Sequence, residues 1–295
     1  MKNFKLFFLL SVLILGSSIT SQAQLKLLSG LENGTYEALS KDMMKVSSQE
    51  MVVLNSNGSV DNFNQLVDNN NDIFVAFIQY DVLLHNEENS PELRKNLRVL
   101  FPLFLDEEVH IITTKGSKII NIEDLKGKKV AVGTPEQGTF VTAATIKRMS
   151  KIEWKDVEIS SNDALAALNA GEIDAYFYVG GAPVKSLSEI SKDSKLQLVN
   201  ISTNGLEEVY TTKVIKKGTY AWQKKDVHTL AVPTLIACNI HEMTLDTRRK
   251  LNTLLTDTKS NIGAFEKSGH KKWQDVYTKS LYINWPYYYL KPIVE

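Results

Sequence analysis

The residues best placed to do chemistry lie in two similar turns, one in each half of the sequence. The first turn ends in Gly34 and Thr35, the second in Gly138 and Thr139, and each precedes a stretch with helical apolar spacing. Backbone N–H groups at a helix N-terminus, together with a hydroxyl, can hold an anion or another polar group. The same residues are also ordinary helix starts, so one such turn indicates little. Together with the second turn of each half, these two turns predict a ligand site.

The two turns belong to a sequence of elements that occurs twice. Each copy has a strand, the Gly-Thr turn, a helix, a second strand, a second turn, a second helix and an Asp-led buried strand. Thr35 and Thr139 are separated by nearly the same offset as Asp72 and Asp174. Strands that alternate with helices in this way predict parallel-sheet α/β units. The expected strands are 25–28, 51–54, 73–78, 128–132, 157–159 and 175–179.

The organisation expected from these copies is α/β and bilobal, with two parallel-sheet lobes joined by a hinge that the chain crosses twice. Residues 96–112 and 232–238 are the extended stretches that would make the crossings. Two crossings permit the lobes to close on a ligand. We therefore expect the first lobe at 24–108, the second at 109–228, and a return to the first lobe with C-terminal helices at 229–295.

Residues 1–23 are expected to form a signal peptide rather than part of the fold. Lys2 and Lys5 give a basic start, 6–15 is almost wholly apolar, and Ala23 follows small residues suited to a signal peptidase. The apolar run is too short to span a bilayer. The mature protein is therefore predicted to be soluble and periplasmic or otherwise extracytoplasmic.

Composition and motifs argue against several other classes of function. The 295 residues have 34 Lys+Arg and 34 Asp+Glu, and this neutral balance disfavours a nucleic-acid partner. Cys238 is the single cysteine, which excludes a multi-thiolate metal site. Thr139 stands where a nucleotide-binding P-loop requires lysine. We expect no cofactor and no enzymatic activity.

Candidate ligand residues follow from where the turns must lie. Loops at the carboxyl ends of parallel strands are where open α/β sheets bind ligands, so four turns from two facing lobes would surround one cleft. Gln79 or Gln137 would orient the ligand, while Tyr36 and Tyr178 would supply apolar wall.

These residues resemble the TAXI family, the solute-binding subunits of TRAP-type transporters. The segments that carry the resemblance are Ser29–Tyr36, Asn57–Ser59 with Asn62, Phe77–Asp81, Leu100–Leu103, Ile122–Thr139, Ala175–Pro183 and Ala231–Leu235. The resemblance implies a type II periplasmic-binding-protein fold that delivers an amino acid or small carboxylate to a sodium-driven permease. It implies ligand contacts from Gly34, Thr35, Tyr36, Asn57, Ser59, Gln79, Gln137, Gly138, Thr139, Gly180 and Gly181.

The charges near the turns indicate a second class of solute, because they do not suit an anion. Glu32 and Glu136 lie beside two of the turns, and no arginine adjoins any of the four. Fixed charges of this sign disfavour an anionic ligand, so a neutral or amine-bearing solute is the alternative. Two other functions also stay open, an exported sensor or adaptor without a permease and an enzyme that uses Cys238 as nucleophile.

Overall fold

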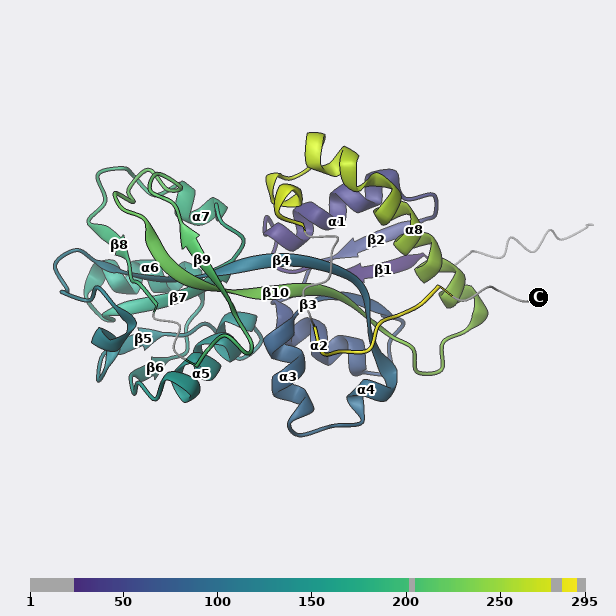
Figure 1. Cartoon of the computed structure of the whole chain (residues 1–295), viewed down its shortest axis with the longest axis horizontal. Coiled ribbons are helices and arrows are strands. Elements are labelled where there is room, and N and C mark those ends of the chain that lie inside the picture. Colours follow the sequence, from purple (N-terminus) through teal and green to yellow (C-terminus); the bar gives the residue numbers. More distant parts are fainter. Residues whose placement is uncertain (1–23, 202–204, 277–282, 291–295) are drawn as a thin grey trace, which may run out of the picture.

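The computed structural model describes residues 24–201, 205–276 and 283–290. Figure 1 shows two lobes side by side, joined by two long strands. The expected signal peptide, 1–23, lies outside the described residues. No helix within the described ranges is long and apolar enough to cross a membrane.

The first lobe contains three parallel strands with helices after each. In chain order its elements are β1 (Leu25–Leu28), α1 (Thr35–Val46), β2 (Met51–Leu54), α2 (Ser59–Val67), β3 (Val75–Gln79), α3 (Tyr80–Glu87) and α4 (Leu93–Asn96). β1 lies between β2 and β3 and is parallel to both. Every residue of β3 is buried, as expected for an apolar strand covered on both faces.

The second lobe repeats this arrangement. Its elements are η1 (Ile122–Leu125), β5 (Lys129–Ala131), α5 (Gly138–Ser150), β6 (Lys155–Val157), α6 (Ser161–Ala170), β7 (Ala175–Gly180), α7 (Lys185–Ser188), β8 (Leu196–Leu198) and β9 (Thr211–Ile215). β5 lies between β6 and β7 and is parallel to both. Gly171 ends α6 in the left-handed conformation with φ 74°, a common way to terminate a helix.

Two long strands make the predicted crossings. β4 (Leu97–Thr114) and β10 (Val227–Asn239) pair antiparallel along their length. β10 also pairs with β3, and β4 pairs with β7, so the two parallel sheets join into one sheet. Eight of the ten strands described in it have the order β2-β1-β3-β10-β4-β7-β5-β6, while β8 pairs with β4 and β9 pairs with β10. The expected lobe boundaries, 108/109 and 228/229, fall inside these strands.

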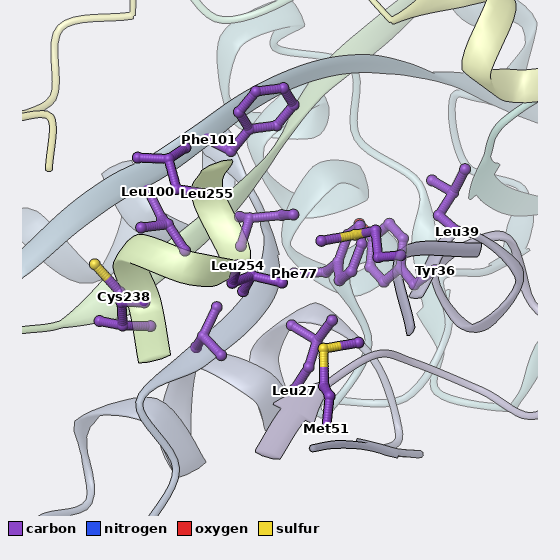
Figure 2. Close-up of a cluster of buried hydrophobic side chains, with 14 of the residues drawn as sticks. Leu27, Tyr36, Leu39, Met51, Phe77, Leu100, Phe101, Cys238, Leu254 and Leu255 are labelled. Atoms are coloured by element: carbon purple, nitrogen blue, oxygen red, sulfur yellow. The ribbon is translucent and has the colours of Figure 1, made fainter. Parts of the chain in front are cut away.

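The C-terminal part of the chain packs on the first lobe. α8 (Leu245–Ser268) and η2 (Lys271–Asp275) cover one face, where their side chains join a buried cluster with β1, α1 and β3 (Figure 2). Trp273 is fully buried, its ring stacks on Phe265 at 4.5 Å, and its indole N–H donates to Asp42 Oδ2 at 3.1 Å. This contact ties the end of the chain to α1.

We predict that Trp273→Ala lowers the free energy of unfolding by about 3–5 kcal/mol, because it removes a large buried ring and leaves a cavity. Urea unfolding followed by circular dichroism measures this. Trp273→Phe is the matched control, since it keeps the stacking but not the N–H donor, and about 1–2 kcal/mol should be lost. Equal losses for the two variants would contradict a dominant role for ring packing.

Cys238 offers a direct check of the core. It lies in β10, is fully buried in the cluster of Figure 2, and burial raises the pKa of its thiol. The alternative in which Cys238 is a nucleophile does not agree with this environment. We expect its thiol to react with 5,5′-dithiobis(2-nitrobenzoate) only in denaturant. Stoichiometric reaction of the native protein within minutes would contradict this placement.

Candidate functional site

A cavity of about 90 Å³ lies where the turns of the two lobes meet. Its wall is made by the N-terminal ends of α1, α2 and α5, the ends of β3 and β7, and the middle of β4. A larger outer cleft of about 780 Å³ shares Leu31, Gly34, Thr35, Gln137, Ser161 and Tyr178 with it. We refer to the smaller space as the inner cavity.

The structure brings nearly all of the candidate ligand residues to the inner cavity. From the first lobe come Gly34, Thr35, Tyr36, Asn57, Ser59 and Gln79. From the second come Gln137, Gly138, Thr139, Tyr178 and Gly180. These residues lie far apart in the sequence, and the parallel strands place them together because each lies at or after the carboxyl end of a strand.

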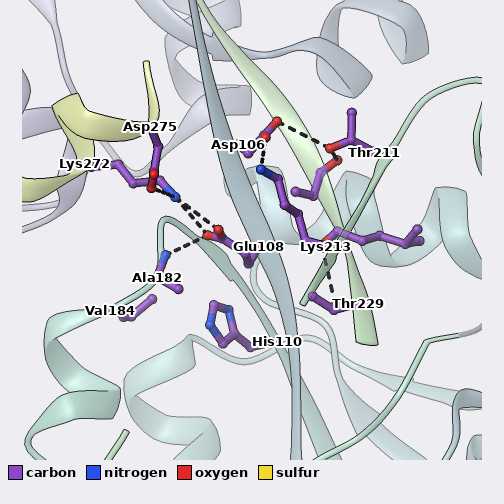
Figure 3. A network of polar contacts seen from close by, with 12 residues as sticks. Asp106, Glu108, His110, Ala182, Val184, Thr211, Lys213, Thr229, Lys272 and Asp275 are labelled. Carbon is purple, nitrogen blue, oxygen red and sulfur yellow. Dashed lines mark hydrogen bonds and ion pairs between the residues drawn. The ribbon is translucent and has the colours of Figure 1, made fainter. Parts of the chain in front are cut away.

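Gly181 is not among the residues that line this cavity. A Cβ atom at Gly181 would lie 2.9 Å from Cε of Lys272, so its small size accommodates a neighbouring side chain. Lys272 Nζ lies 3.1 Å from Glu108 Oε1, and the backbone N–H of Ala182 donates to Glu108 Oε2 at 2.7 Å (Figure 3). Gly181 therefore lies in the loop after β7 against Lys272, which forms an ion pair between η2 and β4.

The two lobes touch beside the inner cavity. The backbone N–H of Asp61 in α2 donates to the carbonyl of Glu136 at 3.0 Å. A Cβ atom on Gly138 would lie 1.6 Å from Oε1 of Gln79, and one on Gly58 would lie 3.3 Å from Cα of Gln137. A methyl group at Gly138 would therefore require Gln79 or Ser59 to move, because the backbone of the second lobe lies close to side chains of the first.

Three helices begin at this cavity without a side-chain cap. Gly34, Gly58 and Gln137 are the N-cap residues of α1, α2 and α5, all three line the cavity, and none makes a capping hydrogen bond. Unsatisfied N–H groups at a helix N-terminus carry partial positive charge. The ends of these helices are therefore suited to negative or hydrogen-bond-accepting parts of a ligand.

Hydroxyl and amide side chains fix the turns around the cavity. Ser59 Oγ accepts from the backbone N–H of Gln79 at 2.8 Å, and Thr139 Oγ1 accepts from that of Val179 at 3.2 Å. Gln137 Oε1 accepts from the backbone N–H of Thr134 at 3.1 Å. These contacts position the turns, and they show that the hydroxyl of Ser59 has a structural role besides any ligand contact.

A buried glutamate completes the wall. Glu107, from β4, is 4% exposed and lines the cavity. Its Oε2 accepts hydrogen bonds from Tyr36 Oη at 2.6 Å, Gln79 Nε2 at 2.8 Å and Thr234 Oγ1 at 2.9 Å. Tyr36 stacks on Phe77 with ring centroids 4.9 Å apart, which holds its hydroxyl toward the glutamate.

Burial has the largest effect on the pKa of Glu107. It raises the pKa of Glu107 to about 7, although the three donors and the charge of Lys272 act in the opposite direction. The pKa of the Tyr36 hydroxyl lies well above its usual value, first because of burial and then because Glu107 is close. Tyr36 is therefore neutral, and its hydroxyl donates a hydrogen bond to Glu107.

Glu107 is not among the ligand residues predicted from the sequence, although a pattern in the sequence indicates it. Three consecutive acidic residues, Asp106 to Glu108, interrupt the extended stretch predicted to cross between lobes. Charged residues in a strand between two lobes are costly to bury unless they have partners. The sequence drew attention instead to Glu32 and Glu136, which are exposed and do not line the inner cavity.

The cavity is acidic rather than basic. Of the described residues that line it, none is a lysine, arginine or histidine, and Glu107 is the carboxylic acid among them. No group of three or more His, Cys, Asp or Glu within the described part of the chain could hold a metal ion. The arrangement can bind a small polar molecule with donors at the helix ends and an acceptor at Glu107.

Comparison with solved structures identifies the fold. The ligand-binding core of GluR0 from Nostoc punctiforme, in complex with L-glutamate, matches with 16% identity and a TM-score of 0.50 over 86% of this chain and 100% of that one. An ancestral arginine-binding protein bound to arginine matches with 15% identity and a TM-score of 0.51 over 86% and 98%. The effector-binding domain of QuiR, in complex with shikimate, matches with 12% identity and a TM-score of 0.51 over 81% and 98%.

The fold is thus the mixed α/β fold of these ligand-binding proteins, with two lobes on one curled sheet. The sequence itself matches the profile of the NMT1-like family over residues 33–280. This match includes both Gly-Thr turns, both crossing strands and Glu107. The chain belongs to the NMT1-like family.

Proposed function

We propose that the protein is an extracytoplasmic receptor that captures a small solute between its two lobes and performs no covalent chemistry. The observation that carries the proposal is the inner cavity, which is enclosed by corresponding turns of two similar halves. An enclosed site shared by two halves, connected by strands that both halves use, suits binding and closure.

Contacts between the lobes support a closing motion. Besides the contact of Asp61 with Glu136, the carboxylate of Asp81 in α3 accepts from Thr142 Oγ1 of α5 at 2.6 Å and from Tyr210 Oη at 2.9 Å. Beside these polar contacts, Val141 of α5 packs in the buried apolar cluster that contains Phe63 and Leu83 of the first lobe. Polar contacts of this kind can break and form again when the lobes open.

The finer proposal concerns the partner and the solute. The resemblance of Ser29–Tyr36, Phe77–Asp81 and Ala175–Pro183 to TAXI receptors supports delivery to a TRAP-type permease. The same resemblance supports an amino acid or a small carboxylate as the solute. The predicted signal peptide supports a periplasmic or otherwise extracytoplasmic location.

Native mass spectrometry of the freshly purified chain that begins at Gln24 tests the proposal. We expect an added mass from a retained small molecule, lost on mild denaturation and restored by that molecule with a saturable isotherm. Titration with libraries of amino acids, organic acids and other metabolites covers a solute lost in purification. Absence of both retained mass and saturable binding would contradict a receptor function.

The close approach at Gly138 gives a prediction about closure. We expect Gly138→Ala to weaken solute binding by about tenfold or more, because the new methyl group meets Gln79 and the closed arrangement becomes less populated. Opening of the cleft relieves the conflict, so the melting temperature of the solute-free protein should change little. Isothermal titration calorimetry and small-angle X-ray scattering measure the affinity and the openness.

Gly263→Ala is the matched control for this substitution. Gly263 lies within α8 and has no atom within 4 Å of a Cβ built on it. Alanine there should stabilise the helix by up to about 1 kcal/mol and leave the affinity unchanged. Wild-type affinity in Gly138→Ala would show that the lobes do not close through this contact.

A further inference from the structure

The hydrogen bonds to Glu107 are concentrated on one oxygen of its carboxyl group. All three hydrogen bonds that the described residues make to its carboxyl reach the same oxygen, Oε2. The side chain nevertheless lines the inner cavity. One oxygen is thus fixed by the protein, while the carboxyl group forms part of the surface that faces the solute.

The cavity has two kinds of polar group, donors at the helix ends and an acceptor at Glu107. The uncapped helix ends at Gly34, Gly58 and Gln137 present N–H donors and partial positive charge. Glu107 presents a carboxyl acceptor from the crossing strand. A ligand that matches both kinds has an acceptor or anionic part and a separate cationic donor.

We infer that Glu107 receives a protonated amino group of the solute, so that the receptor selects small amine-bearing molecules over their amine-free counterparts. The inference rests on the proposed function and deepens it by naming the ligand class and the residue that selects it. A carboxylate held by donors on one oxygen can accept from an ammonium group through the other, as a charge-assisted hydrogen bond.

The surroundings of Glu107 favour the ionised form once a cation is present. Tyr36 of α1, Gln79 of β3 and Thr234 of β10 donate to it, and the charge of Lys272 in η2 also lowers its pKa. Asp81 and Tyr178 are the other titratable groups whose charge couples to this cluster, Asp81 through Tyr36 and Tyr178 through Glu107. Lys272 is engaged by Glu108 and Asp275, so none of the groups named here is a direct cationic partner of Glu107.

The opposite possibility is a protonated Glu107 that donates to an anionic solute, and pH separates the two. With a pKa of about 7 in the empty protein, the carboxyl is mostly protonated at pH 6 and mostly ionised at pH 8. An ammonium ligand binds the ionised form, so its affinity should rise about tenfold from pH 6 to pH 8. An anion that binds the protonated form would show a falling affinity over the same range.

The experiment uses pairs of probes that differ in the amino group. The pairs are L-glutamate and glutarate, L-leucine and 4-methylpentanoate, and the retained solute with its des-amino analogue. Calorimetric titrations at pH 6, 7 and 8 should show that the amine-bearing member of a binding pair binds about 10- to 100-fold more tightly. They should also show affinity that rises with pH.

Glu107→Gln removes the charge with little change in shape. It should abolish the preference for the amine and the pH dependence, while the amine-free probe keeps its affinity. Asp106→Asn is the matched control, because Asp106 is a buried neighbour whose carboxylate pairs with Lys213 at 2.6 Å and does not line the cavity. This control should retain both the preference and the pH dependence.

Thr234→Val gives a second test that does not depend on the folding of Glu107→Gln. It removes one donor to the carboxylate and keeps the charge, so the midpoint of the pH dependence should move to higher pH while the amine preference remains. Thermal unfolding at pH 8 checks each variant. Glu107→Gln should melt at or above the wild-type temperature there, because burial of the ionised carboxyl opposes folding.

Each outcome decides the inference. A preference that disappears in Glu107→Gln and persists in Asp106→Asn supports it. Equal or tighter wild-type binding of the amine-free probe overturns it and leaves the receptor function standing. If no pair binds saturably, the inference fails, and the library titration decides separately whether the protein is a receptor at all.

Discussion

The antiparallel pairing of β4 with β10 is the constraint on which the rest of the structure depends. These two strands are shared by both lobes, because β3 pairs with one side of the ribbon and β7 with the other (Figure 1). Their hydrogen bonds place the helix ends of the two halves opposite each other. Without a common ribbon, the turns that end in Thr35 and Thr139 would have no fixed relation.

The same ribbon brings together the polar groups at the bottom of the cleft. Glu107 from β4 and Thr234 from β10 meet across it at 2.9 Å, and Tyr36 and Gln79 reach the same oxygen from the first lobe. Glu108, the next residue in β4, instead contacts Lys272 and the N–H of Ala182 (Figure 3). Successive residues of a strand face opposite sides, so adjacent glutamates serve two different contacts.

Local pattern predicted most of the repeated parts of the fold, although the strand expected at 157–159 is β6 at Lys155–Val157. Apolar runs at 25–28 and 51–54 became β1 and β2 with the expected bounds, and Gly171 ends α6 in the left-handed conformation. These features depend on short-range chemistry, the burial of apolar side chains and the conformational freedom of glycine. The candidate residues follow from them because parallel strands bring their carboxyl ends to one edge.

The parts of the site that could not be predicted from the sequence depend on contacts between residues far apart in the chain. The family resemblance implied a ligand contact for Gly181, whereas its neighbour in space is Lys272. Glu107 and Thr234 are partners only through the register of β4 and β10. A shift of that register by one residue would turn Glu107 away from the cavity. No local pattern encodes such a register.

The buried carboxyl of Glu107 determines the electrostatics of the inner cavity. Burying a carboxyl without a direct cationic partner costs free energy, and the raised pKa of Glu107 expresses that cost. A core that needed only stability would place an apolar residue or a complete ion pair at this position. Three donors stabilise the carboxylate but do not neutralise it, whereas neighbouring Asp106 and Glu108 both have lysine partners. Among the described residues that line the inner cavity, Glu107 is therefore an acidic group with no ion-pair partner, and the ammonium group that we infer for the solute would supply the charge that the fold does not.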